Sequence, residues 1–196
     1  IITPSQFAAD EIRAFMSPRR IEVIPYGVSP SLQVRAEAEV DAIRALDLEP
    51  GRYVVHAAGV SQRKNVETLA DAGRLVARQR PDLRLALCGA RSQRRMDIFE
   101  GVPNVRMLGK VQPETVADLM SGALCVVVPS IYEGFGLPAL EGMAVGAPVV
   151  AARRGALPEV CRDAALLVEP DAGSIAGAIC DVAGDETARR QLRSAG

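Results

Sequence analysis

The sequence predicts an α/β fold, a doubly wound, Rossmann-like parallel sheet with helices on both faces. Short apolar runs alternate along the chain with longer segments in which apolar residues recur at helical spacing. Strands that alternate with helices pair in parallel through right-handed crossovers, which gives this type of sheet. The chain has 196 residues, 48% of them hydrophobic, so it is long enough to bury one full core.

Seven apolar, β-type runs predict the strands, at residues 21–24, 53–57, 83–88, 105–108, 124–128, 149–151 and 165–168. Helical spacing predicts six helices, at residues 5–15, 36–46, 65–79, 113–121, 138–145 and 174–182. Ser5 can cap the first helix, and Pro113 and Pro138 suit the opening turns of theirs. Residues 29–34 are predicted to connect the opening elements to the main sheet.

Composition excludes several classes of function. A net charge of −1 and an aromatic content of 4% disfavour a nucleic-acid-binding surface. The four cysteines are widely spaced and show no metal-binding pattern, which indicates free thiols in a reducing compartment. The apolar runs are too short to span a bilayer, and no signal peptide is visible. We therefore expect a cytoplasmic protein without a cysteine-based metal site.

Four loops are expected to meet at one edge of the sheet, because ligands of parallel sheets collect beyond the carboxyl ends of the strands. These loops contain residues 59–65, 89–91, 109–111 and 129–141. Each loop alone is a weak signal, and it is their convergence that predicts a binding site.

The segment 129–141 is the most informative of the four. Glu133 and Glu141 lie eight positions apart, separated by a glycine-rich turn and by Pro138 in a first helical turn. Free N–H groups at a helix start accept phosphate, and carboxylates on either side accept hydrogen bonds from sugar hydroxyls. This pattern predicts a nucleotide-sugar site.

Arg63 and Lys64 are adjacent cations in the loop after the strand at 53–57. A solvated basic turn is the simpler explanation for such a pair. Their place at the carboxyl end of a strand, preceded by Gly59, favours neutralisation of a diphosphate instead.

Two other readings of the glutamate segment stay open. Residues 134–139 match the pattern G-x-G-x-x-G/A of a dinucleotide site, which would indicate an NADP-dependent oxidoreductase. Five residues separate that motif from its strand, and the motif lies late in the chain, so we disfavour this reading. Glu133 and Glu141 could also be the acid pair of a glycosidase, but sequence spacing does not fix the distance between two carboxyl groups.

Several polar residues are assigned structural roles. His56, the only histidine, lies within a strand and is expected to be a structural residue. Arg91, Arg94 and Arg95 are expected to form a solvated loop. Glu159 is expected to cap or pair locally, and Ser130 and Tyr132 to orient the loop of Glu133.

These motifs resemble the donor-binding half of GT-B fold glycosyltransferases, in the large retaining group called family four or group one. The resemblance runs through residues 3–8, 24–28, 59–65, 108–111, 129–141, 146–150, 157–160 and 166–170. The Glu-x7-Glu element with its Gly-Phe-Gly-Leu-Pro filling is its most specific part. Tyr26, where asparagine is usual, and Gly142, where alanine is common, depart from the pattern.

The resemblance implies a role for each site residue. Glu133 would contact the transferred sugar and Glu141 the ribose, and Arg63 and Lys64 would hold the diphosphate. Glu133, Arg63 and Lys64 would then be the catalytic residues. The remaining donor-binding residues would be Gly59 in the phosphate loop, Gly134, Phe135, Gly136 and Leu137 through their amides, and Gly109, Lys110 and Val111 beside the base.

The resemblance also implies the reaction. It would be metal-independent, retaining hexosyl transfer from a nucleoside diphosphate sugar to an acceptor hydroxyl, with GDP-mannose as the favoured donor. Residues 1–196 would be the donor domain alone, without the N-terminal acceptor half and the closing C-terminal helix, and would transfer nothing by themselves. A lipid acceptor at the inner membrane face is one option. The alternative from another class is a non-catalytic nucleotide-binding module.

Overall fold

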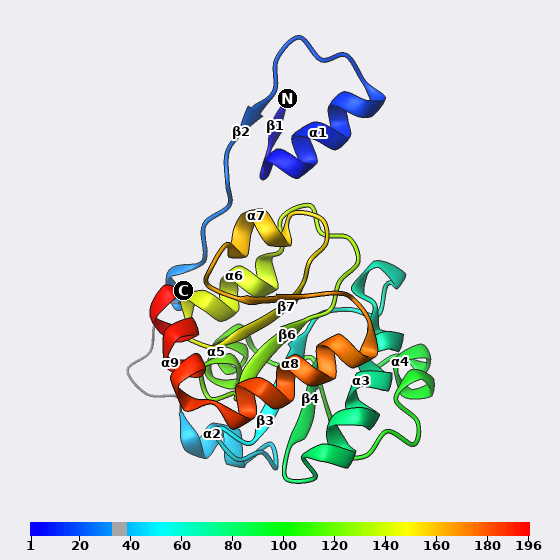
Figure 1. Ribbon diagram of the computed structural model, residues 1–196, viewed down its shortest axis with the longest axis vertical. Helices are drawn as coiled ribbons and strands as arrows, with labels where there is room; N and C mark the ends of the chain where they lie inside the picture. Colours follow the sequence, from blue (N-terminus) through cyan, green and yellow to red (C-terminus); the bar gives the residue numbers. More distant parts are fainter. Residues whose placement is uncertain (33–38) are drawn as a thin grey trace.

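A computed structural model describes residues 1–32 and 39–196 of the chain. Its centre is a six-stranded sheet in the order β5-β4-β3-β6-β7-β8, in which all neighbours pair in parallel (Figure 1). The strands are β3 (Tyr53–Ala57), β4 (Arg84–Cys88), β5 (Val105–Gly109), β6 (Cys125–Val128), β7 (Val149–Ala152) and β8 (Leu166–Val168). The predicted doubly wound α/β fold is confirmed.

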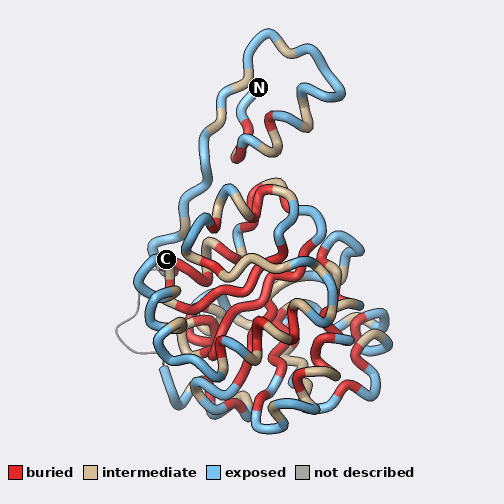
Figure 2. Tube along the Cα trace, in the orientation of Figure 1, coloured by how far each residue is buried: buried red, intermediate tan, exposed pale blue. Residues whose placement is uncertain are grey.

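Helices cover both faces of this sheet. One face packs against α2 (Val40–Arg44), α5 (Pro113–Ser121), α6 (Leu137–Ala144) and α7 (Leu157–Cys161). The other packs against α3 (Val66–Gln79) and α8 (Ala172–Gly184), with α4 (Gln93–Ile98) and α9 (Glu186–Ala195) at its margins. Figure 2 shows the buried residues concentrated along the strands.

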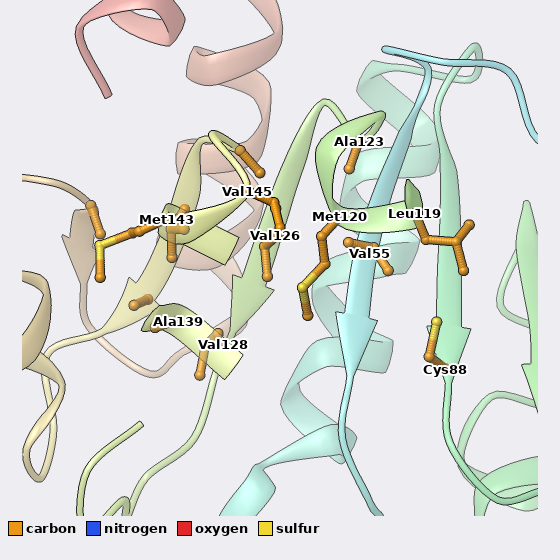
Figure 3. Close-up of a cluster of buried hydrophobic side chains, with 14 of the residues drawn as sticks. Val55, Cys88, Leu119, Met120, Ala123, Val126, Val128, Ala139, Met143 and Val145 are labelled. Carbon is orange, nitrogen blue, oxygen red and sulfur yellow. The ribbon is translucent and has the colours of Figure 1, made fainter. Parts of the chain in front are cut away.

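Each strand contributes to both cores, because successive side chains of a strand point to opposite faces. In β3, Tyr53 and Val55 join the core under α5, whereas Val54 joins the core under α3. Figure 3 shows the first core, where Val55 of β3 and Val126 of β6 lie beside Met120 of α5. Strands that are apolar on both faces are typical of a parallel sheet, and they hold the loops at its carboxyl edge in place.

A second, two-stranded parallel sheet projects from this body (Figure 1). It pairs β1 (Ile2–Thr3) with β2 (Glu22–Val23), and α1 (Gln6–Phe15) connects them. The hydroxyl of Ser5 donates to the carbonyl oxygen of Gly134, 2.6 Å away. The β1-α1-β2 unit is thereby attached to the glycine-rich turn of the predicted site.

The structure corrects some predicted elements. The run at 21–24 forms β2 outside the main sheet. Of the helix expected at 36–46, residues 36–38 lie outside the described part, and the described helix is shorter than predicted, because α2 begins after Glu39, which is extended, and ends at Arg44 in a turn. Of the connector 29–34, residues 30–32 form a short 3-10 turn, η1 (Pro30–Leu32), and 33–34 are not described. Three helices escaped prediction, because α4 and α7 are too short to show a period and α9 buries none of its residues.

Within the described residues, no helix is long and apolar enough to cross a membrane. The four cysteines are free thiols, of which Cys88, Cys125 and Cys161 are buried.

Candidate functional site

A pocket of about 450 Å³ lies at the carboxyl edge of the sheet, between the loops that follow β3 and β6. Its lining comprises Pro4, Tyr26, Arg63, Lys64, residues 133–138 and Glu141. Residues from three separate parts of the chain therefore meet in one place. The predicted convergence is confirmed for the loops at 59–65 and 129–141, whereas the loops at 89–91 and 109–111 contribute no residue to this lining.

The glycine-rich turn opens α6 toward this pocket. Gly136, the residue before α6, has a φ of +100°, and a Cβ there would come within 2.7 Å of Leu157 Cδ2. Only glycine therefore fits this position without displacement. Pro138 stands in the first turn, where its missing N–H costs nothing. Of the first three residues of α6, Pro138 has no N–H and the N–H of Ala139 donates to the carbonyl oxygen of Gly136 at 3.0 Å, so the N–H of Leu137 is the one without an acceptor within the helix. The positive end of the α6 dipole also lies on this side of the pocket and attracts anions.

Arg63 and Lys64 enter the pocket from the loop after β3. They belong to the 3-10 turn η2 (Gln62–Lys64), which Asn65 ends in the left-handed conformation, with a φ of +54°. The side-chain amide of Asn65 donates to the carbonyl oxygens of Pro129 (3.1 Å) and Pro170 (3.2 Å). Asn65 therefore ties the cation loop to the loop after β6. This role was not predicted, although an Asn beside the two cations is the signal that could have suggested it.

The two cations converge on one carboxylate. Lys64 Nζ donates to Glu133 Oε1, and Arg63 Nη1 lies 3.2 Å from Glu133 Oε2. Glu133 and Lys64 are 5% and 9% exposed, whereas the Arg63 side chain is 52% exposed. Glu133 thus neutralises a buried positive charge that would otherwise be costly. A diphosphate offers the same kind of oxygen acceptors to these two cations.

The backbone of Glu133 is held as firmly as its side chain. Its carbonyl oxygen accepts from the N–H of Ala156 at 2.9 Å. Gly155, with a φ of +59°, packs so closely that a Cβ there would lie 2.7 Å from that oxygen and 2.8 Å from the Glu133 nitrogen. The N–H of Ile131 donates to the carbonyl oxygen of Arg63 at 2.9 Å. The loop after β6 is therefore preorganised by the loop after β7 and by the cation loop.

Glu141 lies in the second turn of α6 and also lines the pocket. Burial raises the pKa of its carboxyl above the usual value, and the charge of Lys64 opposes this shift. No described residue donates a hydrogen bond to it. The carboxylate is available to accept hydrogen bonds from a hydroxylated ligand.

Gly59 of the predicted phosphate loop and the predicted base-side residues Gly109, Lys110 and Val111 lie outside the lining of this pocket. Gly59 follows β3 and is exposed, and Gly109 is the last residue of β5 rather than a loop residue. Its carbonyl oxygen accepts from the N–H of Gly89 at 2.8 Å. Lys110 and Val111 follow directly, so this loop shares the carboxyl edge of the sheet with the pocket.

Two structural expectations are wrong. Arg95 is not solvated but 1% exposed, because its guanidinium folds under the ends of β3 and β4, whereas Arg91 and Arg94 are exposed as expected. Glu159 does not act locally. Its carboxylate accepts from the backbone N–H groups of Gln6 (2.7 Å) and Phe7 (3.0 Å), and so caps α1 across 153 residues of sequence.

His56 and Tyr132 behave as expected. His56 is buried in β3 with Nδ1 3.1 Å from the carbonyl oxygen of Val127, and burial lowers its pKa to about 4, so it is neutral. Tyr132 contacts the Phe7 ring edge-on, with centroids 5.5 Å apart, which anchors the loop of Glu133 to α1. Ser130 is fully buried in the same loop.

Pro4 and Tyr26 line the pocket without having been predicted to do so. Tyr26 packs edge-on against Phe135, with ring centroids 5.2 Å apart. No local signal could have placed these residues, because Pro4 lies in the β1-α1-β2 unit and Tyr26 in the segment just after it, more than 100 positions before the glycine-rich turn.

Comparison with known proteins shows which family has a similar sequence. The family model described as "Glycosyl transferases group 1" matches residues 51–185. The chain is 34% identical over 181 residues to O-antigen chain mannosyltransferase B of Escherichia coli, a match that covers 87% of this chain and 48% of that protein. The chain thus spans about half the length of this curated relative.

Solved structures agree with the family match. Sucrose-phosphate synthase from Thermosynechococcus elongatus superposes with a TM-score of 0.82 at 29% identity, over 99% of this chain and 51% of that one. HepE from Anabaena, in complex with UDP and glucose, superposes with a TM-score of 0.84 at 23% identity, over 98% of this chain and 55% of that one. The second likeness is one of fold.

Proposed function

This chain belongs to the group 1 glycosyltransferases and forms a C-terminal GT-B domain, and we propose that it binds a nucleoside diphosphate sugar in the pocket between β3 and β6. The observation that carries the proposal is the joint approach of Lys64 and Arg63 to Glu133 beside the open helix start of α6. Cations and free amides suit a diphosphate, and carboxylates suit sugar hydroxyls.

In the proposed complex, the oxygen atoms of the diphosphate replace the Glu133 carboxylate as the partners of Lys64 and Arg63. Charge builds on the departing nucleoside diphosphate as the glycosidic bond breaks, and fixed cations in a partly dry pocket stabilise that charge. The proposal gives these two side chains the part that a divalent cation plays in other transferases, so no metal or cofactor is assigned. Gly134, Phe135, Gly136 and Leu137 would direct backbone N–H groups at the phosphate and sugar oxygens.

The released carboxylate of Glu133 then accepts hydrogen bonds from the transferred sugar, while Glu141 accepts from the ribose. Gly109, Lys110 and Val111 border the base at the same edge of the sheet, and Gly59, which opens the phosphate loop after β3, lies between them and the diphosphate. We assign retaining transfer to an acceptor hydroxyl, with the acceptor bound by a separate N-terminal domain. The incomplete coverage of the longer relatives supports this division, in which residues 1–196 are the donor domain and do not transfer sugar alone.

GDP-mannose is our favoured donor, and the mannosyltransferase relative supports a mannosyl donor. The neighbour with UDP and glucose supports a nucleoside diphosphate sugar more generally. Membrane lipids are among the acceptors that fit the proposal.

Calorimetry of the chain tests the proposal directly. GDP, UDP, ADP, their common sugar conjugates, NAD and NADP would be titrated in the absence and presence of a metal chelator. One nucleoside diphosphate and its sugar conjugate should bind best, unaffected by the chelator. A preference for NADP would contradict the proposal and favour a dinucleotide site.

A further inference from the structure

Arg95 is the most unusually placed charged side chain outside the pocket. It lies in α4, where its own N–H donates to the hydroxyl of Ser92 at 3.3 Å, and it is 1% exposed. Its neighbour Arg94 is exposed and pairs with Glu67. Burying a guanidinium costs several kcal/mol of desolvation unless its donors find good acceptors.

The acceptors of Arg95 are backbone carbonyl oxygens at the ends of two adjacent strands. Nη1 donates to Cys88, the last residue of β4, at 3.0 Å, and Nη2 donates to Ala58, the residue after β3. No described carboxylate forms an ion pair with Arg95, and among the described residues Nε has no partner. A guanidinium that neutralises charge would have an acidic partner, whereas that of Arg95 bridges the ends of two strands, β3 and β4.

The close fit at Gly89 extends this bridge to a third strand. Gly89 follows β4 with a φ of +124°, and a Cβ there would lie 2.6 Å from the carbonyl oxygen of Ala58 and 3.2 Å from Arg95 Nη2. The N–H of Gly89 donates to the carbonyl oxygen of Gly109, the last residue of β5, at 2.8 Å. The ends of β3, β4 and β5 are thus joined through the Arg95 guanidinium and Gly89.

We propose that Arg95 is a positioning residue for the nucleoside end of the donor, because it holds the loops that begin at Gly59, Gly89 and Gly109 in their binding arrangement. This inference rests on the proposed function, which places the base beside these loops. Arg95 does not touch the donor. It acts through the three strand ends, whereas Arg63 and Lys64 act on the diphosphate.

This division of roles predicts a distinct binding pattern. Arg95→Met keeps a long apolar side chain but removes the hydrogen-bond donors of the guanidinium. The nucleoside part of the ligand should then bind less well to the three loops. Affinity for a nucleoside diphosphate and for the matching monophosphate should fall by the same factor, at least tenfold. The ratio of the two affinities should stay as in the wild type, because the phosphate contacts remain.

The experiment measures calorimetric affinities for GDP and GMP, UDP and UMP, and ADP and AMP, together with hydrogen–deuterium exchange of residues 58–60, 89–91 and 109–111. Arg94→Met is the matched control on the same helix, and it should change neither readout. Arg95→Lys retains a charge and three donors and should restore part of the affinity and slow the exchange. If Arg95→Met does not fold, the same comparison is made with Arg95→Lys, which should then lie between wild type and loss of binding.

The outcomes separate the two claims. Faster exchange at all three loops with a parallel loss of diphosphate and monophosphate binding supports the inference. Unchanged exchange, or a loss confined to the diphosphate, overturns it and leaves the proposed function standing. A wild-type chain that binds none of these nucleotides contradicts the proposed function, and the exchange rates still decide whether Arg95 holds the three strand ends.

Discussion

Lys64 and Glu133 form a buried ion pair across 69 residues of sequence, and this pair joins the loop after β3 to the loop after β6. Both partners line the candidate donor pocket. Breaking a buried pair by removing one partner leaves the other charge without compensation. The pair therefore stabilises the domain and also competes with any anion that binds Lys64.

Glu133→Gln separates these two effects. The variant should unfold at a lower temperature, with a loss of about 3 kcal/mol, because Lys64 stays buried without its carboxylate. It should also bind the nucleoside diphosphate more tightly, by roughly tenfold, or about 1.4 kcal/mol. The sugar conjugate should gain less, since the contact to the sugar is lost. Calorimetry measures the nucleotide affinities and thermal unfolding measures the stability. Glu169→Gln, which breaks the exposed pair of Glu169 with Arg154, is the control. Weaker diphosphate binding by Glu133→Gln would contradict this account.

Glu141→Gln should change how stability depends on pH. Burial raises the folded-state pKa of Glu141 above 4.5, so the wild type loses stability as pH rises from about 4.5 through that raised pKa. The glutamine variant lacks this loss, and its melting temperature should exceed that of the wild type increasingly toward neutral pH.

Glu67→Gln provides a control of opposite sign. The hydrogen bond from Arg94 lowers the pKa of Glu67, so its carboxylate stabilises the fold above pH 4.5 and this contribution is lost on acidification. Glu67→Gln should therefore be less stable than the wild type at neutral pH, and the difference in melting temperature between the two should disappear at low pH. Equal behaviour of the two variants would show that Glu141 is not desolvated in solution.

Gly155→Ala tests how tightly the backbone of Glu133 is held. The new methyl would lie within 2.8 Å of both the nitrogen and the carbonyl oxygen of Glu133, so the loop must shift. We expect a loss of stability of about 2–3 kcal/mol and at least tenfold weaker nucleotide binding. Gly51→Ala is the matched control, because Gly51 also has a positive φ, +73°, but open space around its Cβ position. Similar losses in both variants would mean that backbone strain, and not displacement of Glu133, is responsible.

Much of the fold could be predicted because its strands are apolar on both faces. The run at 53–57 coincides with β3 and the segment 113–121 with α5, where a proline marks the helix start. The helices that escaped prediction lack a long apolar stripe, although Pro158 stands in the first turn of α7. In α7 only five residues are helical, and α9 is held through Leu192 and arginine contacts rather than a buried stripe.

The candidate site could be predicted in part because the parallel pairing of these strands was itself predictable. Arg63, Lys64, Glu133 and Glu141 all follow the carboxyl ends of strands, and parallel pairing brings those ends together. Tyr26 and Arg95 could not be placed in this way. Their positions depend on the docking of the β1-α1-β2 unit and on a buried guanidinium that local polarity predicts to be exposed.

The most direct test of a diphosphate held by Lys64 is a calorimetric comparison of the wild type with Lys64→Ala, using the nucleoside diphosphate that the wild type prefers. Loss of one charge-assisted contact costs about 1.5–3 kcal/mol, so affinity should fall roughly 10- to 150-fold. Binding of the uncharged nucleoside should be unchanged, and Arg74→Ala, which removes a partly exposed cation of α3, should leave both affinities intact. Equal diphosphate affinity in wild type and Lys64→Ala would contradict the account.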